Sequence, residues 1–346
     1  MKALYLDKKE ALSLRDDPVP QHLGANDVRI KIANVGVCGS DVHYYLHGRI
    51  GGFIVNEPMV LGHEASGTVI EVGSAVKTLK IGDRVCMEPG IPDYASRETL
   101  KGMYNLDPEV RFWATPPIDG CLRESIVHPA NLTFKLPDNV SFEEGALVEP
   151  LAIGVHSAKK ARIVPGDTAL VLGAGTIGLV TALSAVAAGC SQVIIADSKQ
   201  EKLDFVNKHY GSKIGTFNIA TGDLKAHIGE HYPQGLDIVF EASGNAHAIL
   251  STTGFLCPGG KVVLIGMPQD PAPIDIVEAQ TKEIEFLTIF RYANVYDRAI
   301  KYIASGQINV KPLITHRYDF DDALKAFEYA ATMPGDAIKI MIKLPD

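Results

Sequence analysis

The chain has 346 residues, of which 46% are hydrophobic and 21% charged, and its formal net charge is −8 at pH 7. This length allows about two domains, and the composition is that of an ordinary globular protein. The acidic balance and the lack of a long Lys/Arg block argue against nucleic acid or an anionic membrane as a partner. Apolar runs end before membrane-spanning length, and the charged residues 7–10 predict that there is no secretory signal.

The cysteines predict a reducing compartment. Five are scattered through the chain, none in a Cys-x-x-Cys pair: Cys38, Cys86, Cys121, Cys190 and Cys257. An odd, scattered set argues against a disulfide framework and favours the cytoplasm. A buried, inert thiol is the default for each of them.

The first part of the chain is predicted to be β-rich. Short strands between glycine and asparagine turns are expected at residues 28–32, 69–73, 82–85 and 124–127. We expect a compact, irregular, barrel-like domain up to about residue 150.

Three side chains in this domain are candidate metal ligands. Cys38 lies in Gly-Val-Cys-Gly-Ser-Asp, and His63 and Glu64 stand side by side in Gly-His-Glu-Ala-Ser-Gly. A thiolate, an imidazole and a carboxylate all suit Zn²⁺, and three protein ligands with an open position are typical of catalytic zinc. Taken alone, an adjacent His-Glu pair is more often a surface polar pair. Glu149 is a fourth candidate, either as a direct ligand or through the metal's water.

Residues 88–117 carry prolines, glycines and mixed charge without a sustained period. A long irregular segment inside a domain is often functional. Its aromatic residues Phe112 and Trp113 either line a cleft or pin the segment onto the barrel.

The pattern changes after Pro150 to alternating helices and strands, which predicts a parallel, doubly wound sheet. We expect helices at residues 151–161 and 179–188 and strands at 167–172, 192–196, 237–240 and 261–265. The strand near 262–265 is a candidate for the sheet's edge and for pairing across a dimer. The tail is expected to contain a helix at 320–331 and a closing strand at 338–342.

A dinucleotide site is predicted at the first turn of this sheet. Gly173, Gly175 and Gly178 follow a strand and precede a helix, and Asp197 ends the next strand. The glycines permit a tight turn, approach of a pyrophosphate and close helix packing. Asp197 would accept hydrogen bonds from the adenine ribose and repel a 2′-phosphate, which favours NAD over NADP. Lys202 either covers the adenine or is a solvated helix residue, and a flavin or regulatory nucleotide is the alternative ligand.

A zinc ion and a nicotinamide together indicate alcohol chemistry. Zinc acts as a Lewis acid that lowers the pKa of a bound hydroxyl, and the nicotinamide accepts hydride.

The sequence resembles the zinc-dependent medium-chain alcohol dehydrogenases, in the branch of sorbitol (L-iditol) and xylitol dehydrogenases. The stretches that carry the resemblance are residues 37–45, 62–67, 104–106, 114–117, 144–151, 290–292 and 309–317. The resemblance implies an α/β protein with two domains. A β-rich GroES-like catalytic domain would span 1–150 and 290–346, and a Rossmann NAD-binding domain would span 151–289.

The resemblance also implies roles for individual residues. Cys38, His63 and Glu64 would bind the catalytic zinc, and Glu149 would contact its water and the substrate. The polyol would be surrounded by Tyr44, Phe112, Arg291 and Tyr292. Ser40 and His43 would relay the hydroxyl proton, unless His43 is only a surface residue. Further cofactor contacts would be Ile177, Asp197, Lys202, Ile265, Gly266, Met267, Ile289, Phe290 and Arg291.

One departure from the wider family is informative. Many members carry four closely spaced cysteines in the segment that corresponds to residues 88–106, where they bind a structural zinc, and this chain has none there. We therefore expect one catalytic zinc and no structural zinc. The family also suggests a homotetramer.

The predicted function is NAD-dependent oxidation of xylitol or sorbitol to the ketose. An L-arabinitol or other small-diol dehydrogenase is the enzyme alternative. A non-catalytic dinucleotide-binding protein is the alternative of a different class.

Overall fold

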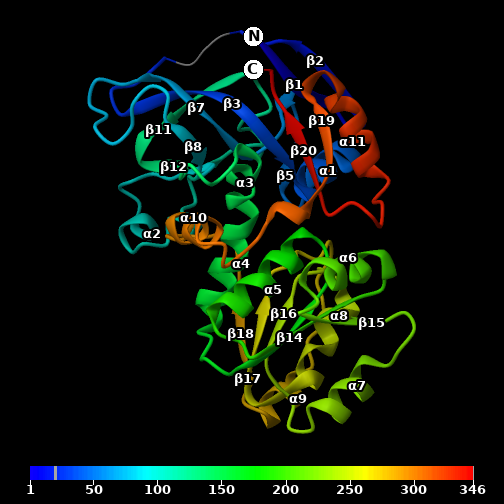
Figure 1. Ribbon diagram of the computed structural model, residues 1–346. Helices are drawn as coiled ribbons and strands as arrows, with labels where there is room; N and C mark the ends of the chain where they lie inside the picture. Colours follow the sequence, from blue (N-terminus) through cyan, green and yellow to red (C-terminus); the bar gives the residue numbers. More distant parts are fainter. Residues whose placement is uncertain (19–21, 346) are drawn as a thin grey trace. The chain divides into compact units, whose positions relative to one another are not determined.

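The computed structural model describes residues 1–18 and 22–345, which form two compact units (Figure 1). The first unit consists of Met1–Glu149 with Tyr296–Asp346, and the second of Pro150–Val295. The chain returns to the first unit between Val295 and Tyr296, where the sequence indicated a change near residue 290. A backbone hydrogen bond from Ile289 N to Leu264 O ties this segment to the second unit's sheet.

The first unit is built on a seven-stranded sheet in the order β12-β8-β7-β3-β20-β19, with β11 also paired to β3. β3 is its centre, and the C-terminal β20 runs beside it, red next to blue in Figure 1. Residues of β3 alternate between buried and half-buried over most of its length, because successive side chains of a strand point to opposite faces. The strands of this unit are β1 (Lys2–Lys8), β2 (Ala11–Asp16), β3 (Asp27–Val37), β4 (Arg49–Ile50), β5 (Phe53–Ile54), β6 (Met59–Val60), β7 (Glu64–Val72), β8 (Arg84–Met87), β9 (Gly90–Ile91), β10 (Arg111–Phe112), β11 (Ser125–Pro129), β12 (Thr133–Lys135), β19 (Ile314–Asp319) and β20 (Lys339–Lys343).

Short helices connect these strands. The first of them, α1, begins at Cys38 with a capping box, in which the Asp41 side chain accepts from the Cys38 backbone. Ser141 and Glu144 form a second capping box at the start of α3. The helices of this unit are α1 (Gly39–His47), α2 (Arg97–Leu100), η1 (Tyr104–Leu106), η2 (Ala130–Leu132), α3 (Phe142–Ala146), α10 (Tyr296–Ala304), η4 (Lys311–Leu313), η5 (Phe320–Asp322) and α11 (Ala323–Ala331), and α4 (Val148–Ala161) leads into the second unit.

The second unit is a six-stranded parallel sheet in the order β15-β14-β13-β16-β17-β18. The first strand lies in the middle and the chain winds outward on each side in turn, as a doubly wound sheet requires. Its strands are β13 (Thr168–Leu172), β14 (Gln192–Asp197), β15 (Gly215–Asn218), β16 (Leu236–Glu241), β17 (Leu256–Leu264) and β18 (Glu285–Thr288). Its further helices are α5 (Thr176–Ala188), α6 (Gln200–Tyr210), α7 (Leu224–His231), α8 (Ala246–Ser251), η3 (Thr252–Phe255) and α9 (Ile276–Thr281). The predicted class, a β-rich part followed by a doubly wound parallel sheet, is confirmed.

One expectation about this sheet is wrong. Residues 262–265 fall at the end of β17 and just beyond it, and β17 pairs with β16 on one side and β18 on the other. The outer strand on this side is therefore β18. Half of its residues are polar. An interior strand of a parallel sheet is buried on both faces, which explains the valines of β17.

Two helices begin at other residues than the apolar pattern predicted. Helix α5 begins at Thr176, inside the glycine loop, and ends at Gly189, which adopts φ 118°. The 320–331 segment starts with a 3₁₀ turn before α11. In the part of the chain that the structure describes, no helix combines the length and apolarity needed to cross a bilayer.

Candidate metal centre and dinucleotide site

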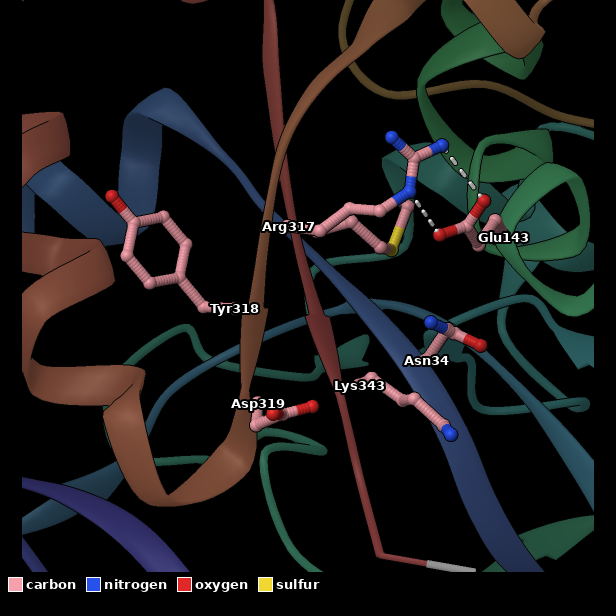
Figure 2. A pocket seen from close by; sticks show the side chains of 7 residues that line it. Asn34, Glu143, Arg317, Tyr318, Asp319 and Lys343 are labelled. Atoms are coloured by element: carbon pink, nitrogen blue, oxygen red, sulfur yellow. Dashed lines mark hydrogen bonds and ion pairs between the residues drawn. The ribbon is translucent and has the colours of Figure 1, made fainter.

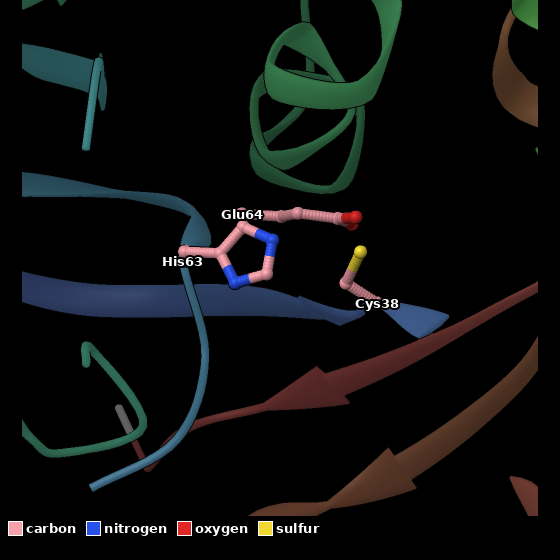
Figure 3. Close-up of side chains that lie close together, drawn as sticks. All are labelled: Cys38, His63 and Glu64. Atoms are coloured by element: carbon pink, nitrogen blue, oxygen red, sulfur yellow. The ribbon is translucent and has the colours of Figure 1, made fainter. Parts of the chain in front are cut away.

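The first unit brings together the three predicted metal ligands. Cys38 directly follows β3, and Glu64 opens β7, which pairs antiparallel to β3 with Glu64 opposite Gly36. His63 precedes Glu64 and approaches from the same side (Figure 3). One ligand atom from each of Cys38, His63 and Glu64 lies within 4.8 Å of the others. Over residues 1–18 and 22–345, this is the only group of three or more such side chains that could hold an ion.

Asp41 orients this group. Its Oδ2 accepts a hydrogen bond from Cys38 N and its Oδ1 from Gly62 N, each at 3.1 Å. The same Oδ1 lies 3.6 Å from Nδ1 of His63, whose other ring nitrogen is turned toward Cys38 and Glu64 in Figure 3. A carboxylate behind a histidine fixes the ring and leaves the opposite nitrogen for a metal.

The electrostatics of the site favour a cation. Burial alone lowers the pKa of His63, but the Asp41 carboxylate and the Cys38 thiol outweigh burial and hold the pKa well above its ordinary value. A buried ring that is stabilised in its charged form marks a place where positive charge is favourable. The ligand set and this charge balance both fit a zinc ion.

Glu64 has a second partner that the sequence did not reveal. Nζ of Lys339, on β20, lies 2.7 and 2.8 Å from the two carboxylate oxygens of Glu64. The side chains of Lys339 and Glu64 are 3% and 1% exposed, so this is a buried ion pair. Burial lowers the pKa of Lys339, but the Glu64 carboxylate outweighs burial and raises it.

The remaining predicted site residues of the first unit differ in their surroundings. Phe112 is buried with its ring 5.7 Å from the ring of His63, whereas Tyr44 is buried in the hydrophobic core. Ser40 and His43 are half-buried on α1. Glu149 is buried in the first turn of α4, and its charge contributes to raising the pKa of Lys339.

The two aromatic residues of this segment have different partners. Trp113 packs edge-on against His128, with ring centroids 4.6 Å apart, and so pins the 88–117 segment to the sheet. Phe112, in contrast, faces His63.

The glycine loop of the second unit is shaped for a close approach. Gly173 has φ 103°, which favours glycine, and a Cβ on Gly178 would lie 1.8 Å from the carbonyl oxygen of Gly173. A Cβ on Gly175 would meet no atom within 4 Å, so the space beside it is open. Ile177 lies in the first turn of α5, where backbone N–H groups and the helix dipole favour a phosphate.

Asp197 is bound to this loop. Its Oδ2 accepts a hydrogen bond from Ala174 N at 2.8 Å, and its Oδ1 accepts one from Lys199 N at 2.9 Å. Lys202 lies in the first turn of α6, half-buried, and burial lowers its pKa although Asp197 opposes this shift. The hydrogen bond from Ala174 N therefore holds the Asp197 carboxylate beside the glycine loop.

The other predicted cofactor residues lie at the same edge of the sheet. Ile265, Gly266 and Met267 follow β17, and Ile289, Phe290 and Arg291 follow β18. Ligands of open α/β sheets bind at the carboxyl ends of the strands, which is this edge. Arg291 has φ 54° and its guanidinium lies over the Phe290 ring, and the neighbouring Tyr292 is buried.

A further carboxylate at this edge was missed. Glu241 ends β16 fully buried and accepts hydrogen bonds from Ser243 and from Gly244 N. It also lies close to Gly266, where a Cβ would be 2.8 Å from its Oε2. Glu241 therefore shapes the turn that faces the 265–267 segment.

A separate cavity of about 280 Å³ on the first unit contains none of the predicted site residues (Figure 2). Arg317 donates two hydrogen bonds of 2.6 and 3.0 Å to the Glu143 carboxylate there. The cavity is lined by Asn34, Glu143, Arg317, Tyr318, Asp319, Met341 and Lys343.

Sequence reasoning missed three residues of the two sites: Asp41, Lys339 and Glu241. Asp41 was detectable, because an acidic residue at the third position of a helix is a capping-box signal. Lys339 stands in an apolar strand, and nothing local distinguishes it from a solvent-facing lysine.

Known proteins resemble this chain over nearly its whole length. Two family models match: the alcohol dehydrogenase GroES-like domain over residues 24–138 and the zinc-binding dehydrogenase over residues 176–305. The chain is 56% identical to a D-xylulose reductase of Morganella morganii, covering 96% of this chain and 98% of the relative. It is 42% identical to the sorbitol dehydrogenase of Bos taurus, covering 96% and 93%.

A solved structure supports the same fold. It is a protein from Sinorhizobium meliloti with NADP bound, described as a zinc-binding dehydrogenase and 28% identical to this chain. The TM-score is 0.90, and the alignment covers 99% of this chain and 98% of the other. The predicted GroES-like and Rossmann-type architecture is confirmed, and the chain belongs to the zinc-dependent medium-chain dehydrogenases, in the branch of its D-xylulose reductase and sorbitol dehydrogenase relatives.

Proposed function

We propose that this protein oxidises a secondary alcohol of a sugar alcohol to the ketose, with NAD as hydride acceptor and one zinc ion per chain. Xylitol to D-xylulose and sorbitol to D-fructose are the two reactions we favour. The observation that carries the proposal is the convergence of Cys38, His63 and Glu64 within 4.8 Å. The names of the D-xylulose reductase and sorbitol dehydrogenase relatives support the substrate class.

Cys38, His63 and Glu64 would hold the zinc, with Glu149 beside them as a direct ligand or as a partner of the metal's water. Bound there, zinc supplies a Lewis acid that lowers the pKa of the substrate hydroxyl. The absence of cysteines from residues 88–106 supports a single zinc without a structural one.

The chain's own residues then orient the reactants and move the proton. Asp41 would hold His63 in one orientation, because its Oδ1 lies 3.6 Å from Nδ1. Burial and the neighbouring His47 lower the pKa of His43, which favours the neutral ring that a proton acceptor needs. Ser40, on the same turn of α1, would pass the hydroxyl proton to it.

The second unit would bind the dinucleotide. The open space at Gly175 and the N-terminus of α5 suit the pyrophosphate. The Asp197 carboxylate suits the two ribose hydroxyls and repels a 2′-phosphate, which supports NAD over NADP. Lys202, residues 265–267 and residues 289–291 would complete the cofactor contacts.

In the first unit, Phe112, Tyr44 and Glu149 are the residues that would recognise the polyol. Of these, Phe112 has the most direct support, because its ring lies beside that of His63.

We also propose a cytoplasmic homotetramer. The five free cysteines support a reducing compartment. The outer strand β18, which pairs within the described sheet only with β17, supports self-association at that edge. Light scattering tests the assembly: a tetramer is expected, and a monomer would contradict this part of the proposal.

The experiment that tests the function is a steady-state panel of polyols with NAD and with NADP. Xylitol or sorbitol with NAD should give the highest kcat/KM. Higher kcat/KM for L-arabinitol or a small diol would move the substrate assignment. Lack of dehydrogenase activity on every alcohol, in protein that holds zinc, would overturn the function.

A further inference from the structure

All three N–H donors of Lys339 are directed at the segments that carry the metal ligands. An ammonium has three donors. Two are directed at the two oxygens of Glu64, and the third is donated to the carbonyl oxygen of Val37 at 3.0 Å. Val37 immediately precedes Cys38, so a single side chain links the backbone beside one ligand to the carboxylate of another.

The sheet makes this contact possible. β20 lies beside β3, with Ile340 opposite Val37, and β3 lies beside β7, with Gly36 opposite Glu64. Lys339 therefore reaches across β3 to Glu64. The crossing passes over Gly36, where a Cβ would lie only 2.1 Å from Oε2 of Glu64. The glycine leaves room for the carboxylate to face both Lys339 and the metal centre.

The pairing changes what Glu64 can do as a ligand. A buried carboxylate that has only a metal as partner would become an unpaired charge whenever it left the metal, which is strongly unfavourable. Glu64 instead has an ammonium in contact with both oxygens. The same ammonium withdraws charge from the carboxylate and competes with a metal for its lone pairs.

We propose that Lys339 is a positioning residue that makes Glu64 a weak, exchangeable ligand, with its charge shared between the ammonium and the metal. This inference rests on the proposed zinc function. It assigns to the C-terminal strand a part in setting metal affinity and coordination number.

The test measures zinc affinity, by competition with a chelator, in four proteins: the natural chain, Lys339→Met, Glu64→Gln, and the double variant Lys339→Met/Glu64→Gln. Removing a positive charge raises the affinity for any nearby cation. The informative quantity is therefore the dependence of the Lys339→Met effect on Glu64, as in a double-mutant cycle. The gain in affinity should be at least about tenfold larger with Glu64 present than with Gln at position 64.

Cobalt substitution gives a second readout that a merely structural role would not move. The visible spectrum of the cobalt protein should change with Lys339→Met in the Glu64 background, because the freed carboxylate becomes a full ligand. It should not change with Lys339→Met in the Glu64→Gln background. Lys343→Met, an exposed lysine on the same strand, is the matched control and should leave both readouts at natural values.

An equal gain in both backgrounds, or weaker zinc binding in Lys339→Met, would overturn the assignment. Failure to recover Lys339→Met even with zinc present would also overturn it, because the freed carboxylate would then have no metal partner. If the natural chain itself binds no zinc, it is the proposed function that fails.

Discussion

Gly36 and Glu64 face each other on neighbouring strands, so close that a Cβ on Gly36 would lie 2.1 Å from Oε2 of Glu64. The carboxylate is almost fully buried and is already held by Lys339. An added methyl group therefore forces the carboxylate to turn away from both Lys339 and the proposed metal.

Gly36→Ala should weaken zinc binding by about tenfold or more, since partners of metal ligands typically contribute that much. Gly39→Ala is the matched control, because a Cβ there meets nothing within 4 Å. Zinc retained per chain after dialysis against a chelator series measures the effect. Equal zinc retention in the two variants would contradict the placement of Glu64 at the metal.

The glycine loop offers a similar contrast between two positions. Gly178→Ala should lower the free energy of unfolding by about 1–3 kcal/mol, because its Cβ would overlap the Gly173 carbonyl oxygen. Gly175→Ala should leave stability nearly unchanged, because the space beside it is open. It should nevertheless weaken NADH binding, because a methyl group then occupies the side on which a pyrophosphate approaches.

Urea unfolding and NADH titration of both variants check these outcomes. Unchanged NADH affinity in Gly175→Ala would mean that the dinucleotide binds elsewhere.

These positions also show what sequence can and cannot predict. The Gly173–Gly178 loop and Asp197 were predictable, because strand, turn and helix follow one another along the chain and each glycine has a local steric reason. Cys38, His63 and Glu64 were candidates by chemistry and by resemblance. Lys339 was not, because its contact with Glu64 spans 275 positions and depends on which strand lies beside β3.

The prediction that residues 262–265 form the edge of the second unit's sheet was wrong for a related reason. Residues 262–265 are apolar, and apolarity indicates that a strand is buried but not how many neighbours it has. The parallel pairing of β17 with both β16 and β18 is a property of the assembled sheet. The same limit applied to Glu241, whose hydrogen bonds to the 243–244 turn are local but whose closeness to Gly266 is not.

Asp197→Asn should change cofactor choice. The substitution removes the negative charge but keeps an oxygen that can accept the hydrogen bond from Ala174 N. The ratio of kcat/KM for NAD over NADP should fall at least about tenfold, equivalent to roughly 1.4 kcal/mol. Steady-state kinetics with both cofactors measure the ratio, and an unchanged ratio would exclude Asp197 from recognition of the ribose.

The raised pKa of the buried Glu88 carboxyl predicts that the free energy of unfolding depends on pH. Burial raises the pKa of this carboxyl to about 7, with Glu149 and Asp297 adding to the shift and the hydrogen bond from Tyr104 opposing it. Because the folded-state pKa is higher than the ordinary value of 4.5, the folded protein prefers the protonated form. The associated stability is complete below pH 4.5 and is lost as the pH rises through about 7.

Glu88→Gln should remove this dependence, because the amide is neutral and still accepts from Tyr104. Between pH 5 and pH 8 the natural chain should lose roughly 2.5 kcal/mol of unfolding free energy relative to the variant. Urea unfolding across this pH range tests it, with the exposed Glu230→Gln as a control for the loss of a carboxylate. A constant difference between the natural chain and Glu88→Gln would refute the assigned shift.

We propose above all that Cys38, His63 and Glu64 hold a zinc ion that polyol oxidation requires. It is tested most directly by xylitol- and sorbitol-dependent NAD reduction in protein stripped by a chelator and then reconstituted with zinc, with Cys38→Ser beside it. We predict that activity disappears on stripping, returns as zinc approaches one ion per chain, and does not return in Cys38→Ser. Full activity in the stripped protein, or full zinc binding and activity in Cys38→Ser, would contradict the role of zinc at these three residues.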